Sequence, residues 1–81
     1  KIDVRCVVSH NVVLGENSVL IAGTILYGSV RTGMNAYVAS AVVRNQLQIG
    51  DNAVVGMGSV VVKDVDADVT VAGVPARKLE K

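Results

Sequence analysis

The sequence has few of the residues that fill most protein cores. Its 81 residues include no Trp, no Phe and only two Tyr, and Val is the dominant apolar residue. A compact globule of this length ordinarily fills its centre with Leu and aromatic side chains, so these absences argue against a conventional core. A Val-rich and Gly-rich chain instead suits short stacked strands, because branched side chains pack well on a pleated surface.

Further absences exclude several classes of protein. Cys6 is the only cysteine, so no internal disulfide can form. The net charge is +1, from 8 basic and 7 acidic residues, and the basic stripe that binds nucleic acid is missing. No apolar run approaches the ~20 residues of a membrane span, and no signal peptide is visible. We therefore expect one cytoplasmic domain with no membrane span and no nucleic-acid partner.

A six-residue pattern runs through the chain and is clearest between Ile49 and Lys63. Each unit begins with an aliphatic residue and carries a small or branched residue at its fifth place. A period of six fits neither an amphipathic helix nor an ordinary alternating strand, and it indicates a chain that coils and stacks on itself. The first places are Ile2, Val8, Leu14, Leu20, Leu26, Val43, Ile49, Val55 and Val61, with Thr32 in the same role.

These units predict an all-β fold, a parallel β-helix with a triangular cross-section. If the first and fifth places both point inward, six residues form one side and three sides form an 18-residue coil, and coils stack about 4.8 Å apart. We expect three to four coils over residues 1–66. A final strand and a C-terminal tail, with a helical turn from Ala76, are expected over 67–81. The pattern includes the first residues, so we expect the natural chain to extend upstream.

Two details of the repeat carry further predictions. The units before Tyr37 and after Gln48 differ in phase by one residue, so a one-residue deletion lies between them. Either Tyr37 or Val38 then takes the first place, and in the second case residues 44–48 form the short unit. Glycine and asparagine are expected to occupy corners with positive φ. The expected corner residues are Gly15, Gly33, Gly50, Gly56, Asn17, Asn35 and Asn52.

The period, the phrase IGDNAVVGMGSVVVKDV and the ending VAGVPARKL resemble the hexapeptide-repeat acyltransferases. The resemblance covers essentially the whole chain and implies a left-handed coil and a homotrimer. Two branches of the family are similar. One is the sialic-acid and bacillosamine type of sugar acetyltransferase, which uses acetyl-CoA. The other is the UDP-3-O-acylglucosamine N-acyltransferase of lipid A synthesis, which uses an acyl carrier protein.

Both branches place a catalytic histidine just before an aliphatic-Gly unit, as in SHNVVLG around His10. The His-Asn pair looks like the lipid A branch. The acetyltransferase branch commonly has a carboxylate beside the histidine, where this chain has Ser9 and Asn11. The phrase AGTILYGSV and the ending GVPARKL look more like the acetyltransferase branch, which we favour.

Acyl transfer to an amine or hydroxyl needs a base for the nucleophile and a donor for the oxyanion. His10 is the only histidine, and histidine is the side chain that changes charge near neutral pH. Gly28 lies one 18-residue coil further on, where the family places its oxyanion amide, and a glycine leaves its N–H open. We therefore expect His10 and Gly28 to be catalytic.

The resemblance also implies a coenzyme groove between neighbouring subunits, in which backbone groups at stacked corners hold the coenzyme. Lys63 and Arg77 are candidates to bind its phosphates, because cations favour them. The expected cofactor-binding residues are Val19, Ala22, Ser40, Met57, Lys63 and Arg77.

No metal site is expected, because the γ-class carbonic anhydrases of this fold need three histidines and the chain has one. Cys6 is expected to be a small core residue. The favoured hypothesis is transfer of an acetyl group from acetyl-CoA to an amine or hydroxyl of a nucleotide-linked sugar or another small molecule. The alternatives are an N-acyltransferase dependent on acyl carrier protein and a non-catalytic structural β-helix.

Overall fold

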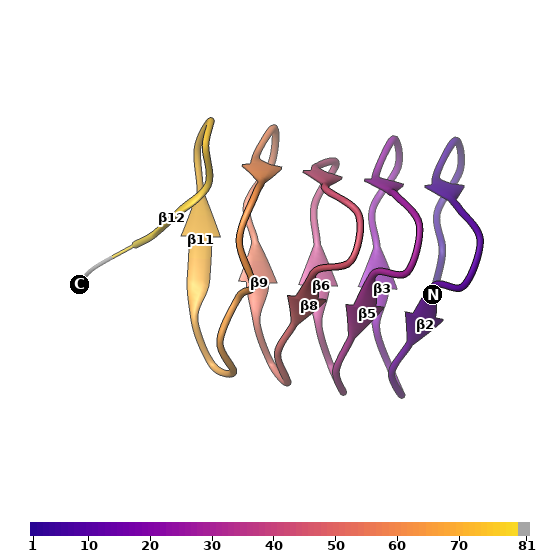
Figure 1. The fold of residues 1–81 in the computed structure, drawn as a ribbon, viewed down its shortest axis with the longest axis horizontal. Coiled ribbons are helices and arrows are strands. Elements are labelled where there is room, and N and C mark those ends of the chain that lie inside the picture. The colour runs from indigo at the N-terminus through magenta and orange to yellow at the C-terminus, as the bar shows by residue number, and fades with distance from the viewer. Residues whose placement is uncertain (80–81) are drawn as a thin grey trace.

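The computed structural model describes residues 1–79, which form a triangular β-helix whose coils stack in a row from one end to the other (Figure 1). The molecule measures 33 × 22 × 21 Å. The described residues contain strands and turns and no helix, and none of them could cross a membrane as a helix. The all-β coiled fold expected from the repeat is confirmed, with about four turns.

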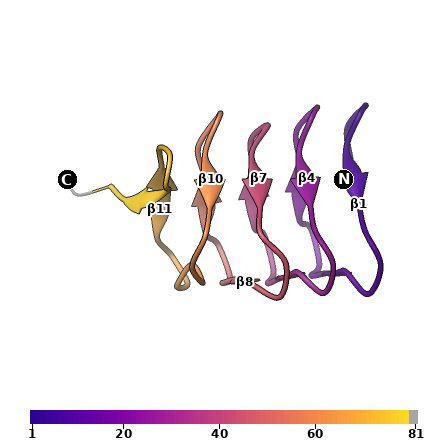
Figure 2. The same cartoon turned by 45° about the horizontal axis from the view of Figure 1, so that its top comes forward.

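Each side of the prism is a sheet to which every coil adds one short strand. Face A contains β3 (Val19–Leu20), β6 (Tyr37–Val38), β9 (Val54–Val55), β11 (Thr70–Ala72) and β12 (Arg77–Lys78). Face B, which Figure 2 shows as a row, contains β1 (Val7–Val8), β4 (Ile25–Leu26), β7 (Val42–Val43) and β10 (Val60–Val61). Face C contains β2 (Val13–Leu14), β5 (Arg31–Thr32) and β8 (Gln48–Ile49). Only the β11–β12 pair is antiparallel among these strands.

Stacked corners form the three edges of the prism. The A–B edge consists of residues 3–6, 21–24, 39–41 and 56–59. The B–C edge consists of residues 9–12, 27–30, 44–47 and 62–64. The C–A edge consists of residues 15–18, 33–36, 50–53 and 66–69. Backbone hydrogen bonds join each corner to the next coil, as from Ser29 N–H to the His10 carbonyl.

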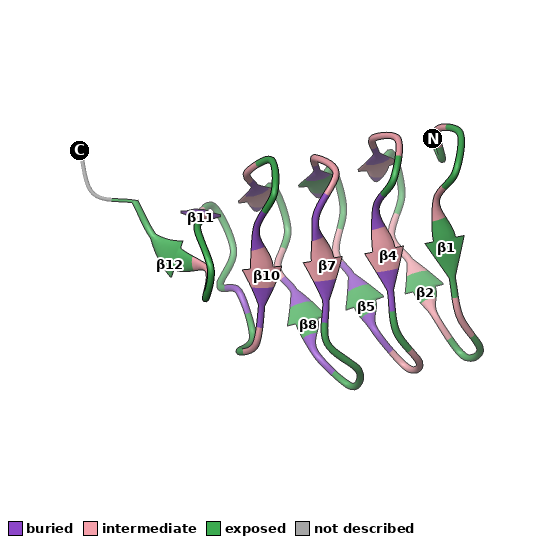
Figure 3. Cartoon of the chain, turned by 90° about the horizontal axis from the view of Figure 1, so that it is seen from above, coloured by how far each residue is buried: buried purple, intermediate pink, exposed green. Residues whose placement is uncertain are grey.

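The core is one column of small and branched side chains along the prism axis. It contains the residues at the first and fifth places of the units from Ser18 onward, and Figure 3 shows buried residues alternating with more exposed ones along the coils. The buried hydroxyls are hydrogen-bonded: Ser18 Oγ lies 3.0 Å from Thr32 Oγ1, and Thr24 and Ser59 donate to backbone carbonyls. Cys6 is partly buried and packs against this core, as expected. The buried apolar residues are Leu20, Leu26, Val30, Ala36, Val38, Ala41, Val43, Leu47, Ile49, Ala53, Val55, Val61, Val65 and Val71.

The one-residue deletion in the repeat lies at the A–B edge. Val38 is fully buried and Tyr37 is 41% exposed, so the assignment of Tyr37 to a first place is wrong. The alternative is only half right, because the missing residue comes between Val38 and Val42 rather than in 44–48. Ser40 turns the corner alone, with φ of 47°. The last coil is shorter still, since Val65 pairs with Ile49, 16 residues before it.

The asparagine corners are confirmed and the glycine corners are not. Asn17, Asn35 and Asn52 have φ between 57° and 60°. The second-place glycines are absent from the residues with positive φ, and most of them allow close contact between coils instead. A Cβ atom on Gly50 would lie 2.4 Å from the backbone nitrogen of Ala67 in the next coil, which no real Cβ contact tolerates.

The end of the chain extends face A. The predicted last strand is β11, which pairs with β9. The predicted helical turn from Ala76 is wrong: Arg77 and Lys78 form β12, which folds back onto β11. The division into a β-helix over 1–66 and a strand and tail over 67–81 stays a prediction, and its last two residues lie outside the described ones.

The two kinds of glycine can be told apart by one substitution. Gly23 has φ of 81°, and a Cβ atom there would meet nothing within 4 Å, so Gly23→Asn should cost little, about 0.5 kcal/mol or less. Gly50→Asn should cost about 1–3 kcal/mol or more, because its side chain meets backbone. Urea denaturation of both variants measures the difference, and equal costs would contradict the contact explanation.

Candidate active site

His10 lies at the B–C edge, on the corner between β1 and β2, and its imidazole covers the α-carbon of Gly28 one coil further on. A Cβ atom on Gly28 would lie 2.6 Å from His10 Cε1 and 2.9 Å from Nε2. The corners are joined by the hydrogen bond from Ser29 N–H to the His10 carbonyl, at 3.0 Å. The 18-residue spacing thus brings the two predicted catalytic residues into contact.

Gly28 presents a backbone donor beside this imidazole. Its N–H donates to no acceptor within residues 1–79, and its carbonyl accepts a hydrogen bond from Gln46 N–H at 2.9 Å. His10 itself is exposed. A ring nitrogen and a free N–H at one open corner are the two groups that acyl transfer requires.

Asn11 holds the other side of the imidazole. Its Nδ2 lies 3.4 Å from His10 Nδ1, and its φ of 58° turns the corner. The Cε1–Nε2 side of the ring is therefore the one nearest to Gly28. An uncharged amide stands where the acetyltransferase branch commonly has a carboxylate, so the histidine is oriented without a neighbouring negative charge.

The predicted coenzyme corners form a continuous stack at the A–B edge. Ser40 Oγ donates to the Ala22 carbonyl at 2.5 Å, and Gly58 N–H donates to the Ser40 carbonyl at 3.2 Å. Met57, which precedes Gly58, is 78% exposed. Val19 lies close to this edge on face A, where it pairs with Tyr37.

Lys63 and Arg77 line one hollow at the C-terminal end of the prism. Its floor is aliphatic and its rim carries three cations, including Lys78, together with Asp64 and Asp66. A cationic rim over an apolar floor suits an anion attached to an apolar group. The residues of the hollow are Val61, Lys63, Asp64, Val65, Asp66, Val69, Val71, Ala76, Arg77 and Lys78.

The predicted site residues do not meet at one place in a single copy. The A–B and B–C edges border opposite sides of face B. Ala22 and Gly28 lie at opposite ends of the segment that crosses this face through β4. One copy therefore does not place His10 on the corners that Ala22, Ser40 and Met57 form.

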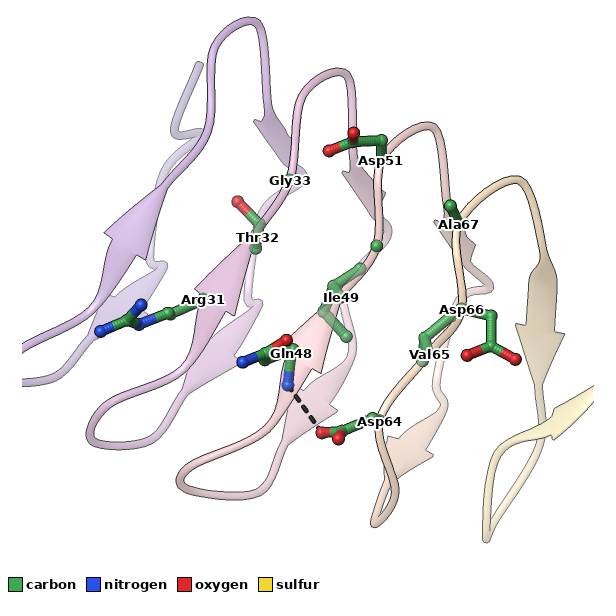
Figure 4. A pocket seen from close by; sticks show the side chains of 11 residues that line it. Arg31, Thr32, Gly33, Gln48, Ile49, Asp51, Asp64, Val65, Asp66 and Ala67 are labelled. Atoms are coloured by element: carbon green, nitrogen blue, oxygen red, sulfur yellow. Dashed lines mark hydrogen bonds between the residues drawn. The ribbon is translucent and has the colours of Figure 1, made fainter.

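A second hollow lies on face C, lined by residues of β5, β8 and the segment 64–67 (Figure 4). Gly33 and Gly50 leave it open, while Arg31, Gln48 and three aspartates surround it. Two of these carboxylates bind the backbone: Asp64 accepts from Gln48 N–H at 2.9 Å and Asp51 from Met34 N–H at 2.8 Å. Their role is structural. Residues 1–79 contain no group of three His, Cys, Asp or Glu side chains placed to hold a metal ion.

Three residues near these sites were not predicted. Asn11 contacts the imidazole, Tyr27 is 50% exposed immediately before Gly28, and Lys78 joins the cationic rim. Tyr27 had a signal in the sequence, because it is one of two tyrosines and adjoins the predicted oxyanion residue. The contact of Asn11 depends on side-chain direction, for which the repeat gives no signal.

Several acyltransferases are similar to this chain in sequence and in fold. No family model matches the chain. The chain is 43% identical over 53 residues to galactoside O-acetyltransferase of Escherichia coli (strain K12), covering 64% of this chain and 26% of that protein. It is 42% identical over 82 residues to UDP-3-O-acylglucosamine N-acyltransferase of Caulobacter sp. (strain K31), covering 100% of this chain and 24% of that protein.

The solved structures agree with the sequence relatives. A mutant of perosamine N-acetyltransferase from Caulobacter crescentus, in complex with CoA and GDP-perosamine, superposes with a TM-score of 0.92 at 34% identity. The match covers 94% of this chain and 37% of that one. The predicted resemblance and the left-handed β-helix are confirmed. The chain spans about a quarter of the length of its curated relatives.

Gly28→Ala tests the contact between the two corners. The added methyl group should displace the imidazole with little loss of stability, because His10 is exposed and free to rotate. The NMR signals of His10, the only histidine, should shift, and transferase activity should fall at least about tenfold. An unchanged histidine spectrum would contradict the contact. Gly58→Ala, at a corner on another edge, is the control for the histidine spectrum.

Proposed function

We propose that the protein transfers an acetyl group from acetyl-CoA to an amine or hydroxyl of a nucleotide-linked sugar. The observation that carries this proposal is the imidazole of His10 over Gly28. It is supported by the likeness to a perosamine N-acetyltransferase whose structure contains CoA and GDP-perosamine, and by the identity to a galactoside O-acetyltransferase.

In this proposal His10 Nε2 takes the proton of the acceptor amine or hydroxyl as that group attacks the thioester carbonyl carbon. The carbonyl oxygen becomes an oxyanion, and the free Gly28 N–H donates a hydrogen bond to it. The carbon–sulfur bond then breaks, and His10 returns its proton to the sulfur, so that the coenzyme leaves as a thiol. Asn11 keeps the Nε2 side of the ring toward Gly28.

We assign acetyl-CoA to the A–B edge. The exposed backbone at the corners of Ala22, Ser40 and Met57 would line its pantetheine arm, with Val19 beside it. Lys63 and Arg77 would bind its phosphates, since the hollow that they line has a cationic rim. Because acetyl-CoA is a cytoplasmic metabolite, the proposal includes a cytoplasmic location, in keeping with the unpaired Cys6.

The active form is proposed to be a homotrimer. A neighbouring copy would bring its A–B edge to the His10 corner of the first, which one copy cannot do alone. The outward side chains of face B are all aliphatic, from Val7 through Ile25 and Val42 to Val60. Such a column favours burial against another subunit. Face C presents Arg31 and Gln48 at the equivalent places.

A carrier-protein-dependent N-acyltransferase is the second candidate function. It is favoured by the His10-Asn11 pair and by the identity to UDP-3-O-acylglucosamine N-acyltransferase over the whole chain. Acylation by acyl carrier protein thioesters, together with inactivity toward acetyl-CoA, would establish this candidate and reject the first. A protein that binds neither donor would be a structural β-helix.

His10→Ala should lower kcat by about 10²–10⁴-fold, because it removes the base. Coenzyme A binding should persist, since Ala22, Ser40 and Met57 lie on another edge, and Lys63 and Arg77 line the hollow at the C-terminal end of the prism. An acetyl-CoA consumption assay on the full-length protein, with calorimetric titration of coenzyme A, measures both. Activity that survives the substitution unchanged would refute the catalytic assignment.

The trimer can be tested on face B. Val42→Lys places a charge in the aliphatic column and should dissociate the trimer, whereas Gln48→Lys at the matching outward place of face C should not. Sedimentation equilibrium of the full-length protein gives the mass of each. A monomeric native protein, or a trimer indifferent to Val42→Lys, would contradict this interface.

A further inference from the structure

Tyr27 is an exposed aromatic residue beside the catalytic corner. It directly precedes Gly28, and Leu26 before it is fully buried, so alternation along the strand points Tyr27 outward. Half of its surface is exposed. The sequence contains no Trp, no Phe and one other Tyr, and neither the core nor the proposed acyl-transfer chemistry uses this ring.

Arg44 lies directly above Tyr27 in the next coil. Tyr27 N–H donates to the carbonyl of Val43 at 3.1 Å, which places Arg44 beside Tyr27 on the outer surface of the B–C edge. Arg44 is exposed. Gly28 thus lies one coil step, about 4.8 Å, from His10, and Arg44 lies one coil step from Tyr27. Tyr27 and Gly28 are neighbours in the chain, with α-carbons about 3.8 Å apart.

The charge around these residues has one sign. Residues 17–50, which make up most of the two middle coils, contain Arg31 and Arg44 but no Asp and no Glu. The carboxylates of the second half of the chain begin at Asp51. An anion at the His10 corner would therefore meet the guanidinium of Arg44 and would not be repelled by acids in these coils.

We propose that Tyr27 and Arg44 bind the acceptor, a sugar linked to a nucleoside diphosphate. The face of Tyr27 packs against the apolar face of the sugar ring, and the planar guanidinium of Arg44 holds the diphosphate through paired hydrogen bonds. The ring is thereby held next to His10 Nε2, to which it presents its amine or hydroxyl. This inference rests on the proposed acetyl transfer and adds the groups that select the acceptor.

The face C hollow is the competing place for such an acceptor, and its charge disfavours it. Arg31 is its one cation, whereas Asp51, Asp64 and Asp66 all line it. In Figure 4 Arg31 lies at one end of the hollow and the aspartates line the other parts. A diphosphate would be repelled by these carboxylates, and the hollow contains no aromatic ring.

The test compares two matched pairs of variants in the full-length protein. Tyr27→Ala and Arg44→Gln should each weaken binding of GDP-mannose or UDP-N-acetylglucosamine at least about tenfold. Tyr37→Ala on face A and Arg31→Gln on face C should leave it within about twofold. Tyr27→Phe should retain binding, because the ring remains. Methyl mannoside, which lacks the diphosphate, should bind at least about tenfold more weakly than GDP-mannose.

The outcomes separate this inference from the proposed function. If the protein binds coenzyme A and consumes acetyl-CoA, but Tyr27→Ala and Arg44→Gln leave nucleotide-sugar affinity unchanged, the acceptor site is wrong and the acetyl transfer stands. Loss of affinity in Arg31→Gln alone would move the site to face C. If the protein binds nucleotide sugars through Tyr27 but neither binds coenzyme A nor consumes acetyl-CoA, the acetyl transfer fails. Failure of both nucleotide sugars to bind also overturns the inference.

Discussion

The backbone ladder between successive coils is the interaction on which the rest of the structure depends. Each coil's N–H groups donate to carbonyls of the next or the previous coil, and this fixes which residues lie above one another. The ladder places Gly28 over His10 and Asn45 over Gly28. Neither the core column nor the candidate active site exists within one coil, because each coil supplies only one layer of both.

The coil was predictable because its signal is local and repeated. From Ser18 onward the first and fifth places proved to be the buried ones, whereas Ile2 and Val8 in the end coil are exposed. The contact of His10 with Gly28 follows from counting one coil. Counting in coils of 18 residues fails where a corner contains fewer residues than the others. Whether one residue can turn a corner, as Ser40 does with φ of 47°, depends on backbone geometry that no spacing of apolar residues encodes.

The site was harder to predict than the fold because its parts depend on the direction of individual side chains. The sequence indicates that Ala22, Ser40 and His10 recur at corners, and only the structure shows two different edges. Asn11 beside the imidazole and Tyr27 before Gly28 lie outside the pattern of aliphatic places. Glycines were misjudged for a related reason: at Gly50 the limiting quantity is the distance to Ala67 and not the backbone dihedral.

The shortened corners show how a coil of a β-helix can change its number of residues during evolution. All three faces continue past the one-residue turn at Ser40, and face A continues through β11 past the short corner at 62–64. Deletions there leave the strands paired, whereas the same deletion within a strand would reverse inward and outward places. Insertions at these corners should be tolerated equally well. The edges are therefore where such a chain can gain loops and new specificities while its scaffold stays unchanged.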